Sequence, residues 1–219
     1  MGILSKNDIE YLKKEFGKSL KNSVEIYVVF SDNCQYCNES KELIQEVAST
    51  SNKIKYKILD MNKDKDFLRK IKLPEGVDHG PLLLFKGQHG KINFGFIGIP
   101  AGHEFSAFIR DIISVSANHL HISKETINKL SKIKKPVDIK VFVTPTCPYC
   151  PSAVYLVHQF AMVNENINAF MIEALEFPKL ADKYKVMAVP KNVINDKVEF
   201  EGAVPEQYFL EQLMLAVGL

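Results

Sequence analysis

The feature that most constrains the fold is an internal repeat that carries every cysteine of the chain. The stretches "SDNCQYCNES" (residues 31–40) and "TPTCPYCPSA" (residues 144–153) each hold two cysteines separated by two residues, and the chain contains 4 cysteines in all. When the pairs are placed in register, "YKILDMN" (56–62) aligns with "AFMIEAL" (169–175). Matches that keep nearly the same offset along the chain indicate a duplicated folding unit.

Two further matches extend the repeat in both directions. Upstream, "SKNDIEYL" (5–12) resembles "SKETINKL" (123–130), and each begins with a serine suited to cap a helix. Downstream, Gly80-Pro81 matches Val189-Pro190, with extra residues in the first copy within "PEGVDHGP". Small drifts in the offset are what loop insertions produce, so the whole chain is predicted to consist of two copies.

Each copy predicts the same order of elements, a leading helix followed by β-α-β-α-β-β-α. A strand-helix-strand start requires parallel pairing with a right-handed crossover, and a closing hairpin adds antiparallel strands to the same sheet. The predicted class is α/β, with a mixed central sheet flanked by helices in each of two units, residues 1–120 and 121–219. The spacing of apolar residues predicts where these elements lie in the two copies. They are the leading helices (7–20 and 124–133), the first strands (24–30 and 137–143), the second strands (ending at Asp60 and Glu173), the short helices (to Leu73 and Val186) and the last helices (103–117 and 205–217).

Charge and hydropathy exclude several classes of function. The formal net charge is only +2 over 219 residues, with acidic and basic residues mixed, so no nucleic-acid partner is expected. Residues 141–164 lack Asp, Glu, Lys and Arg, but Pro145, Pro148 and Pro151 interrupt them, so no membrane span is expected. The first residues lack the apolar core of a signal peptide, which predicts a cytoplasmic protein.

The position of each cysteine pair suits thiol chemistry. A cysteine at the start of a helix faces free backbone N–H groups and the positive end of the helix dipole, which favour the reactive thiolate. Cys34 and Cys147 are therefore the predicted attacking thiols, and Cys37 and Cys150, about one turn further on, are the predicted resolving thiols. Pro151, a few residues into its helix, is expected to remove one helix hydrogen bond.

A tetrahedral zinc site is the alternative use of two cysteine pairs. Such pairs are usually separated by about 15 to 20 residues, whereas here 109 residues lie between Cys37 and Cys147, which follows from their numbers. No metal is therefore expected. The segment "GQHG" (87–90) lacks the strand-to-helix setting of a phosphate loop, so no nucleotide is expected, and the predicted redox groups are the cysteine pairs alone.

These motifs resemble a known family. "CPYC" after a β-strand, followed by a helix and then by "VP" before a hairpin, resembles a thioredoxin or glutaredoxin unit, and two such units in one chain resemble the protein disulfide oxidoreductases of hyperthermophilic archaea and bacteria. The resemblance covers nearly the whole chain and implies two tandem thioredoxin-like folds. It implies that Pro81 and Pro190 are cis and face the disulfides, and that the backbone at Gly80 and Val189 pairs with an extended substrate segment. Trans prolines that start edge strands are the alternative.

The chain departs from the thioredoxin pattern at two places. Thioredoxins have a buried acid six positions before the first cysteine, where this chain has Val28 and Val141, and usually a tryptophan before the CxxC, where it has Asn33 and Thr146. Both departures resemble glutaredoxin and leave deprotonation of the resolving thiols unassigned.

Three other residues have alternative roles. Asp60 and Glu173 either assist the resolving thiols through water or cap the following turn. His79, beside Gly80, either contacts substrate or tunes Cys34, or is a solvated loop residue.

We therefore predict a thiol-disulfide oxidoreductase that acts on protein disulfides by reduction, oxidation or isomerisation. The resemblance implies electrons from a flavoprotein of the thioredoxin reductase type. The alternatives are a dedicated glutaredoxin-like electron carrier to a reductase or peroxidase, and a zinc-held scaffold.

Overall fold

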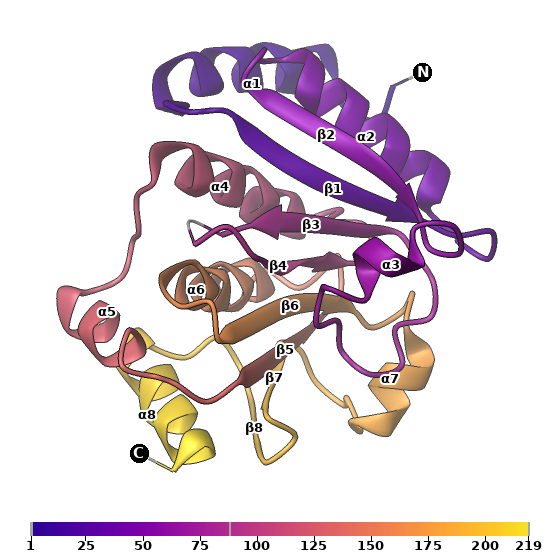
Figure 1. Ribbon diagram of the computed structural model, residues 1–219. Coiled ribbons are helices and arrows are strands. Elements are labelled where there is room, and N and C mark those ends of the chain that lie inside the picture. Colours follow the sequence, from indigo (N-terminus) through magenta and orange to yellow (C-terminus); the bar gives the residue numbers. More distant parts are fainter. Residues whose placement is uncertain (1, 88, 219) are drawn as a thin grey trace.

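The described part of the chain, residues 2–87 and 89–218 of a computed structural model, forms one mixed sheet of eight strands (Figure 1). Gln88, within the predicted "GQHG" turn, lies outside the described residues. The strand order is β2-β1-β3-β4-β6-β5-β7-β8. The strands are β1 (Val24–Phe30), β2 (Ile54–Asp60), β3 (Leu82–Lys86), β4 (Ile92–Ile97), β5 (Val137–Val143), β6 (Ile167–Glu173), β7 (Lys191–Ile194) and β8 (Val198–Glu201).

The duplication predicted from the sequence is confirmed by the pairing of the strands. In the first unit β1 pairs parallel with β2 and antiparallel with β3, and β3 pairs antiparallel with β4. In the second unit β5 pairs in the same way with β6 and β7, and β7 pairs with β8. Each unit is therefore a thioredoxin-like α/β fold with a mixed sheet. A helix connects each parallel pair, as a parallel crossover requires.

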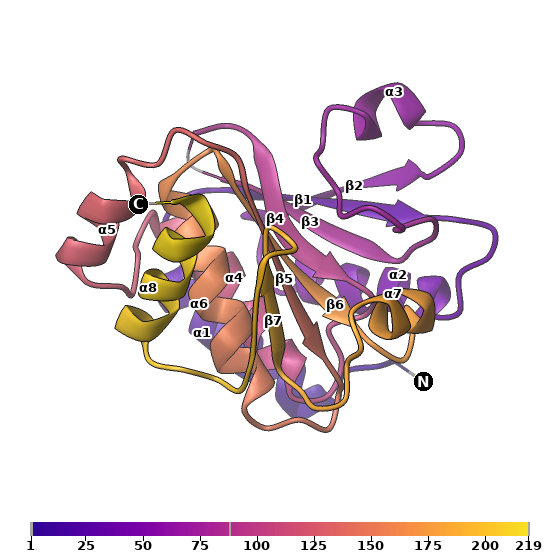
Figure 2. The same ribbon diagram turned by 90° about the horizontal axis from the view of Figure 1, so that it is seen from below.

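The helices cover the two faces of the sheet unequally. The larger apolar cluster holds residues of α1, α2, α4, α5, α6 and α8, and the smaller one holds residues of α3 and α7. Figure 2 shows α4, α6 and α8 on one side of the sheet and α3 and α7 on the other. The helices are α1 (Lys6–Ser19), α2 (Cys37–Ser49), α3 (Lys65–Leu68), α4 (Glu104–Ala117), α5 (Lys124–Leu130), α6 (Cys150–Val163), α7 (Pro178–Lys183) and α8 (Glu206–Val217).

The predicted serine caps are present at the leading helices. The Ser5 hydroxyl accepts the N–H of Asp8, whose carboxylate accepts the N–H of Ser5, which forms a reciprocal capping box. The Ser123 hydroxyl accepts the N–H of Thr126 at the start of α5. These side chains pair N–H groups that have no partner inside the helix.

Several helix bounds differ from the predictions. The short helix α3 ends at Leu68 rather than Leu73, and α7 ends at Lys183 rather than Val186. Helix α6 begins at Cys150, so Pro151 lies in its first turn, where N–H groups have no helical partner. The expectation that Pro151 removes a helix hydrogen bond is therefore wrong.

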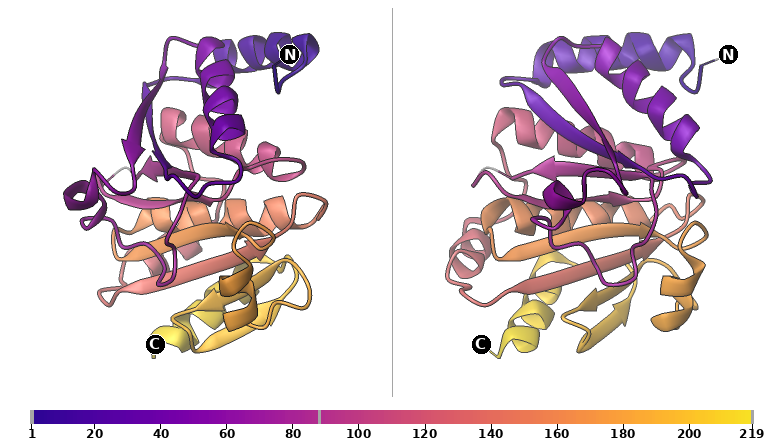
Figure 3. Two further views of the ribbon diagram at one scale, coloured as in Figure 1. Left: turned by 90° about the vertical axis from the view of Figure 1, so that its right-hand side faces the viewer. Right: turned by 45° about the vertical axis from the view of Figure 1, so that its right-hand side comes forward.

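The two units share one sheet. Strand β4 pairs parallel with β6 over Phe94↔Ala169 to Ile97↔Ile172, and the larger apolar cluster includes residues on both sides of this junction. Figure 3 shows the two ends of the chain at opposite ends of the molecule. The predicted boundary at 120/121 falls between α4 and α5.

Within the part of the chain that the structure describes, none of the helices is long and apolar enough to cross a membrane.

Candidate redox sites

Both CxxC segments lie at the same edge of the sheet. Strand β1 is antiparallel to β3, and β3 is antiparallel to β4, which runs parallel to β6 and β5. Strands β1 and β5 therefore run in the same direction, and their carboxyl ends meet one edge. Four strand spacings separate them in the order β1-β3-β4-β6-β5, which corresponds to about 19 Å.

Each cysteine pair forms a disulfide. Cys34 is bonded to Cys37 and Cys147 to Cys150, with the Cα atoms 5.5 Å apart in both. Zinc binds sulfur at about 2.3 Å, so pairs separated by four strand spacings cannot converge on one ion. The geometry thus contradicts a scaffold held by a single zinc ion.

The helices begin at the second cysteine of each pair rather than the first. The chain turns after β1 and β5, and α2 and α6 start at Cys37 and Cys150. The N–H of Cys150 donates to the Cys147 sulfur at 3.1 Å. A backbone N–H at the helix start therefore points at the first sulfur, and this contact stabilises a thiolate there once the disulfide is reduced.

The two disulfides differ in exposure. Cys147 is 7% exposed and Cys150 is fully buried, whereas Cys34 and Cys37 are both half-buried. Tyr149, between the cysteines of the second site, is 71% exposed. The cysteines of the first site are therefore more exposed than those of the second.

The expected cis prolines are confirmed. The Gly80–Pro81 and Val189–Pro190 bonds are cis, and each precedes the first strand of a hairpin. The Val189 carbonyl oxygen lies 3.7 Å from the Cys147 sulfur, so this backbone is next to the second disulfide. The role of these residues in binding substrate stays a prediction.

The first site has glycine where the second has valine, and close packing explains the difference. A Cβ atom at Gly80 would lie 2.5 Å from the Val29 carbonyl oxygen, which is too close for any side chain. The Gly80 N–H donates to the Ser31 hydroxyl at 3.0 Å. A substrate strand that uses this N–H at the first site would have to displace Ser31.

Asp60 and Glu173 both bond to the backbone after their strands. The Asp60 carboxylate accepts the N–H groups of Lys63 and Asn62, which lower its pKa. Glu173 is buried and accepts the N–H of Glu176 at 2.5 Å, while burial raises its pKa. The capping interpretation is confirmed for both, and a role of either in assisting thiols through water stays untested.

His79 is not a solvated loop residue. Its ring stacks on Phe177 of the second unit with centroids 4.2 Å apart, and Nδ1 lies 2.7 Å from an Asp78 carboxylate oxygen. Its Nε2 lies 3.2 Å from the Glu176 carbonyl oxygen. The loop before Pro81 is therefore attached to the second unit beside the first disulfide.

Sequence reasoning missed three buried acids. Val28 and Val141 are fully buried, as expected, but Glu176 beside the first site and Glu104 at the start of α4 bring carboxyl groups into the interior. Burial raises the pKa of Glu176 to about 7 and that of Glu104 to about 8. Glu104 and Asp111 lie on the apolar face of α4, and this break in the apolar pattern was the available signal.

A polar cluster lies between α4 and α6 behind the second site. The Asp111 carboxylate is 2.6 Å from Nδ1 of His158, and both side chains are completely buried. The negative charge of Asp111 adds to the effect of burial on the pKa of Glu104. Helix α6 thus carries Cys150 at its start and, about two turns later, the polar contact of His158 with Asp111 of the first unit.

The comparisons with known proteins agree with this geometry. The family model described as a thioredoxin domain matches residues 137–215. A protein disulfide oxidoreductase from Aeropyrum pernix is 30% identical, with a TM-score of 0.88, and the match covers 98% of this chain and 94% of that one. A structure of the alkylhydroperoxide reductase AhpF from Enterococcus faecalis, 21% identical with a TM-score of 0.85, shares the fold over 96% of this chain and 99% of that one.

The curated relatives are longer proteins. The F subunit of alkyl hydroperoxide reductase from Pseudomonas putida is 24% identical over 206 residues, which are 94% of this chain and 36% of the relative. A protein named NADH dehydrogenase from Bacillus subtilis is 24% identical over 177 residues, or 31% of its length. The chain therefore spans about a third of the length of these relatives.

Proposed function

Since the chain belongs to the family of protein disulfide oxidoreductases, we propose that Cys34 and Cys147 attack the disulfides of protein substrates, and that Cys37 and Cys150 release the products. The family is shown by the similarity to the Aeropyrum pernix enzyme over 94% of that chain. The observation that carries the proposal is the pair of disulfides at the carboxyl ends of β1 and β5, where the fold presents both sites at one edge.

In the reducing direction, the Cys34 or Cys147 thiolate attacks one sulfur of a substrate disulfide, and the other substrate sulfur leaves as a thiolate. The second cysteine of the site then loses its proton and attacks the first. The mixed disulfide breaks, the intramolecular disulfide forms, and the two electrons of the site have passed to the substrate. Oxidation of a substrate dithiol is the same sequence in reverse.

Substrate segments bind next to the cis prolines in this proposal. The backbone of Gly80 and Val189 adds an extended segment as a further strand, and main-chain hydrogen bonds supply affinity with little sequence preference. The contact between the Val189 carbonyl and the Cys147 sulfur supports this placement at the second site. Exposed Met187 and Tyr149 there offer apolar surface to such a segment.

In this proposal the two disulfides are the only redox groups and no cofactor is bound. The proposal also places the protein in the cytoplasm. Electrons then come from a protein partner, for which a flavoprotein of the thioredoxin reductase type has the right chemistry. The extended similarity to the alkyl hydroperoxide reductase relatives supports a second candidate function, a carrier that passes electrons between a flavoprotein domain and a peroxidase.

The test combines a redox titration with cysteine variants. Metal-free protein is equilibrated in graded thiol-disulfide buffers, and each bridge is located by alkylation and mass spectrometry. Insulin reduction is then measured for Cys34→Ser, Cys147→Ser and the double variant. Two reversible bridges, partial activity in each single variant and none in the double variant are expected.

Two other results have distinct meanings. A dedicated carrier would reduce insulin poorly in every form and would support peroxide reduction only with a matching flavoprotein and peroxidase. Wild-type insulin reduction by the double variant would show that Cys34 and Cys147 are not the attacking thiols.

A further inference from the structure

The first site lacks an obvious group to accept the proton of its resolving thiol. A thiol attacks a mixed disulfide as the thiolate, so the Cys37 thiol must lose its proton first. Val28, at the position where thioredoxins have a buried acid, is fully buried among apolar residues. A side chain that accepts this proton therefore lies elsewhere in the fold.

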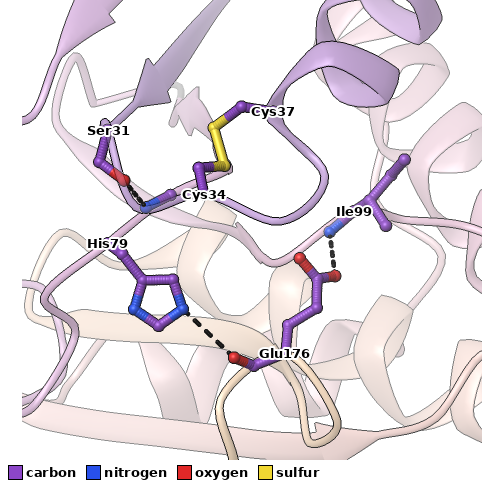
Figure 4. The surroundings of a disulfide bond; sticks show 7 residues. Ser31, Cys34, Cys37, His79, Ile99 and Glu176 are labelled. Carbon is purple, nitrogen blue, oxygen red and sulfur yellow. Dashed lines mark hydrogen bonds between the residues drawn. A yellow bond between two sulfur atoms is a disulfide. The ribbon is translucent and has the colours of Figure 1, made fainter.

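Glu176 reaches the first site from the second unit. It lies between β6 and α7, and its carboxylate accepts the N–H of Ile99, just after β4, at 2.7 Å. Figure 4 shows the Glu176 carbonyl next to His79, and the Glu176 side chain extending from there to Ile99 on the side of the Cys34–Cys37 loop. The contact between the Glu176 carbonyl and His79 Nε2 fixes its backbone beside the same loop.

Two cavities are lined both by Glu176 and by residues next to the cysteines of the first site. One of 340 Å³ is lined by Glu176 and by Asn33, the residue before Cys34. The other, of 370 Å³, is lined by Glu176 and by Gln35 and Tyr36, the two residues between the cysteines. Glu176 lines both, so this buried acid shares a cavity with the residue before Cys34 and with the two residues that follow it.

The packing leaves room for this carboxylate. A Cβ atom at Gly98 would lie 2.7 Å from Oε1 of Glu176 and 2.6 Å from Cβ of Glu173. Glycine at this position, with φ of 101°, therefore lets the two glutamates pack against the end of β4.

The surroundings of Glu176 favour a proton on it near neutrality. Burial, with smaller contributions from the charges of Glu173 and Glu39, raises its pKa to about 7 against the opposing hydrogen bond from Ile99. Because this pKa is close to neutral pH, the group can both accept and donate a proton.

We propose that Glu176 of the second unit is the proton acceptor and donor for the Cys34–Cys37 pair of the first unit. This proposal rests on the proposed function. The proton of the Cys37 Sγ–H passes to the Glu176 carboxylate through solvent in the cavity. The Cys37 thiolate attacks Sγ of Cys34 in the mixed disulfide, the Cys34–substrate bond breaks and the Cys34–Cys37 bond forms. The departing substrate thiolate takes a proton from Glu176 or water.

Other titratable and charged groups face Glu176 and define the controls. Glu173 comes from the end of β6, Glu39 from α2, His79 and Asp78 from the loop before Pro81, and Lys179 from α7. Glu176→Gln removes the titration but keeps an oxygen for the Ile99 N–H. Glu39→Gln changes a more exposed carboxylate of the 370 Å³ cavity.

The experiment isolates the first site in the full chain with Cys147→Ser and Cys150→Ser. The rate of mixed-disulfide resolution is measured by rapid quench between pH 5 and 9, with Glu, Gln or Asp at position 176. We expect a break near pH 7 with Glu176, and a loss of about tenfold at pH 7.5 together with loss of the break in Glu176→Gln. Glu176→Asp should retain a break at a lower rate, and Glu39→Gln should retain it at nearly the full rate.

A second background tests whether the effect is local. With Cys34→Ser and Cys37→Ser, Glu176→Gln should leave the rate of the second site unchanged, which also shows that the variant is folded. An unchanged pH profile of the first site in Glu176→Gln would overturn the proposal while the proposed function stands. No exchange at the first site with Glu176 intact would overturn both.

Discussion

Glu104 is expected to make the stability of the protein depend strongly on pH. Its side chain is 1% exposed, and neither carboxylate oxygen has a hydrogen-bond partner among the described residues. Burial first, and the charge of Asp111 second, raise its pKa from 4.5 to about 8. At 1.36 kcal/mol for each pKa unit, this shift corresponds to about 5 kcal/mol.

The direction of the effect follows from the raised pKa. The folded protein holds the Glu104 proton more tightly than the unfolded chain does. The contribution of this protonation to the free energy of unfolding is therefore complete below pH 4.5 and is lost as pH rises to about 8. Between pH 5 and pH 9 this one group should lower the free energy of unfolding by about 4 kcal/mol. Glu104→Gln removes this contribution, because an amide does not titrate in that range.

Urea unfolding of the oxidised protein, followed by circular dichroism at pH 5, 7 and 9, measures the effect. The buried amide of Glu104→Gln has its own cost, but this cost is the same at every pH and cancels when the pH dependence is compared. From pH 5 to pH 9 the free energy of unfolding of Glu104→Gln should rise by several kcal/mol relative to that of the wild type. The free energy of unfolding of the exposed control Glu42→Gln should change with pH as that of the wild type does. Parallel curves for the wild type and Glu104→Gln would refute the reasoning.

Three other substitutions test the packing between the units and an ion pair within the second unit. Asn93→Leu removes an amide that donates to two buried carbonyls of the second unit at 2.8 and 2.7 Å, and should cost about 2 to 4 kcal/mol in urea unfolding; a loss below about 1 kcal/mol would contradict it. Phe108→Ala should cost about 3 to 5 kcal/mol, and since its cluster spans both units, near-ultraviolet circular dichroism should show one shifted transition rather than two. Asp196→Ala leaves the buried ammonium of Lys140 without its partner at 2.6 Å. Because Asp196 is 58% exposed, water replaces part of the interaction, and a loss of about 1 to 2 kcal/mol in thermal unfolding is expected.

The repeat and the thiol sites could be predicted from the sequence because they depend on short-range patterns. Alternating apolar residues in 24–30 and 137–143 and helical spacing after each CxxC specify elements whose partners are close in the chain. Serine at positions 5 and 123 marks two helix starts by local hydrogen bonds. Asp60 likewise bonds to backbone within three residues of itself. Helix caps, strands and turns of this kind form mainly through contacts between residues that are close in the chain.

The arrangement of the two units was decided only by tertiary packing. Nothing in the residues near Glu176 indicates that its carboxylate meets the N–H of Ile99, or that His79 stacks on Phe177. These contacts exist because β4 pairs with β6. That pairing depends on the burial of apolar faces of strands that are far apart in the chain.

The sequence by itself therefore determined the duplicated fold, the two cysteine pairs and the positions of Pro81 and Pro190 before the hairpins. The structure decided which buried acids lie beside which site, because the proton affinity of a carboxyl group depends on all atoms that exclude water from it. For Glu176 the groups that set this proton affinity come from both units, Ile99 and Glu39 from the first and Glu173 from the second, and only the folded chain brings them together.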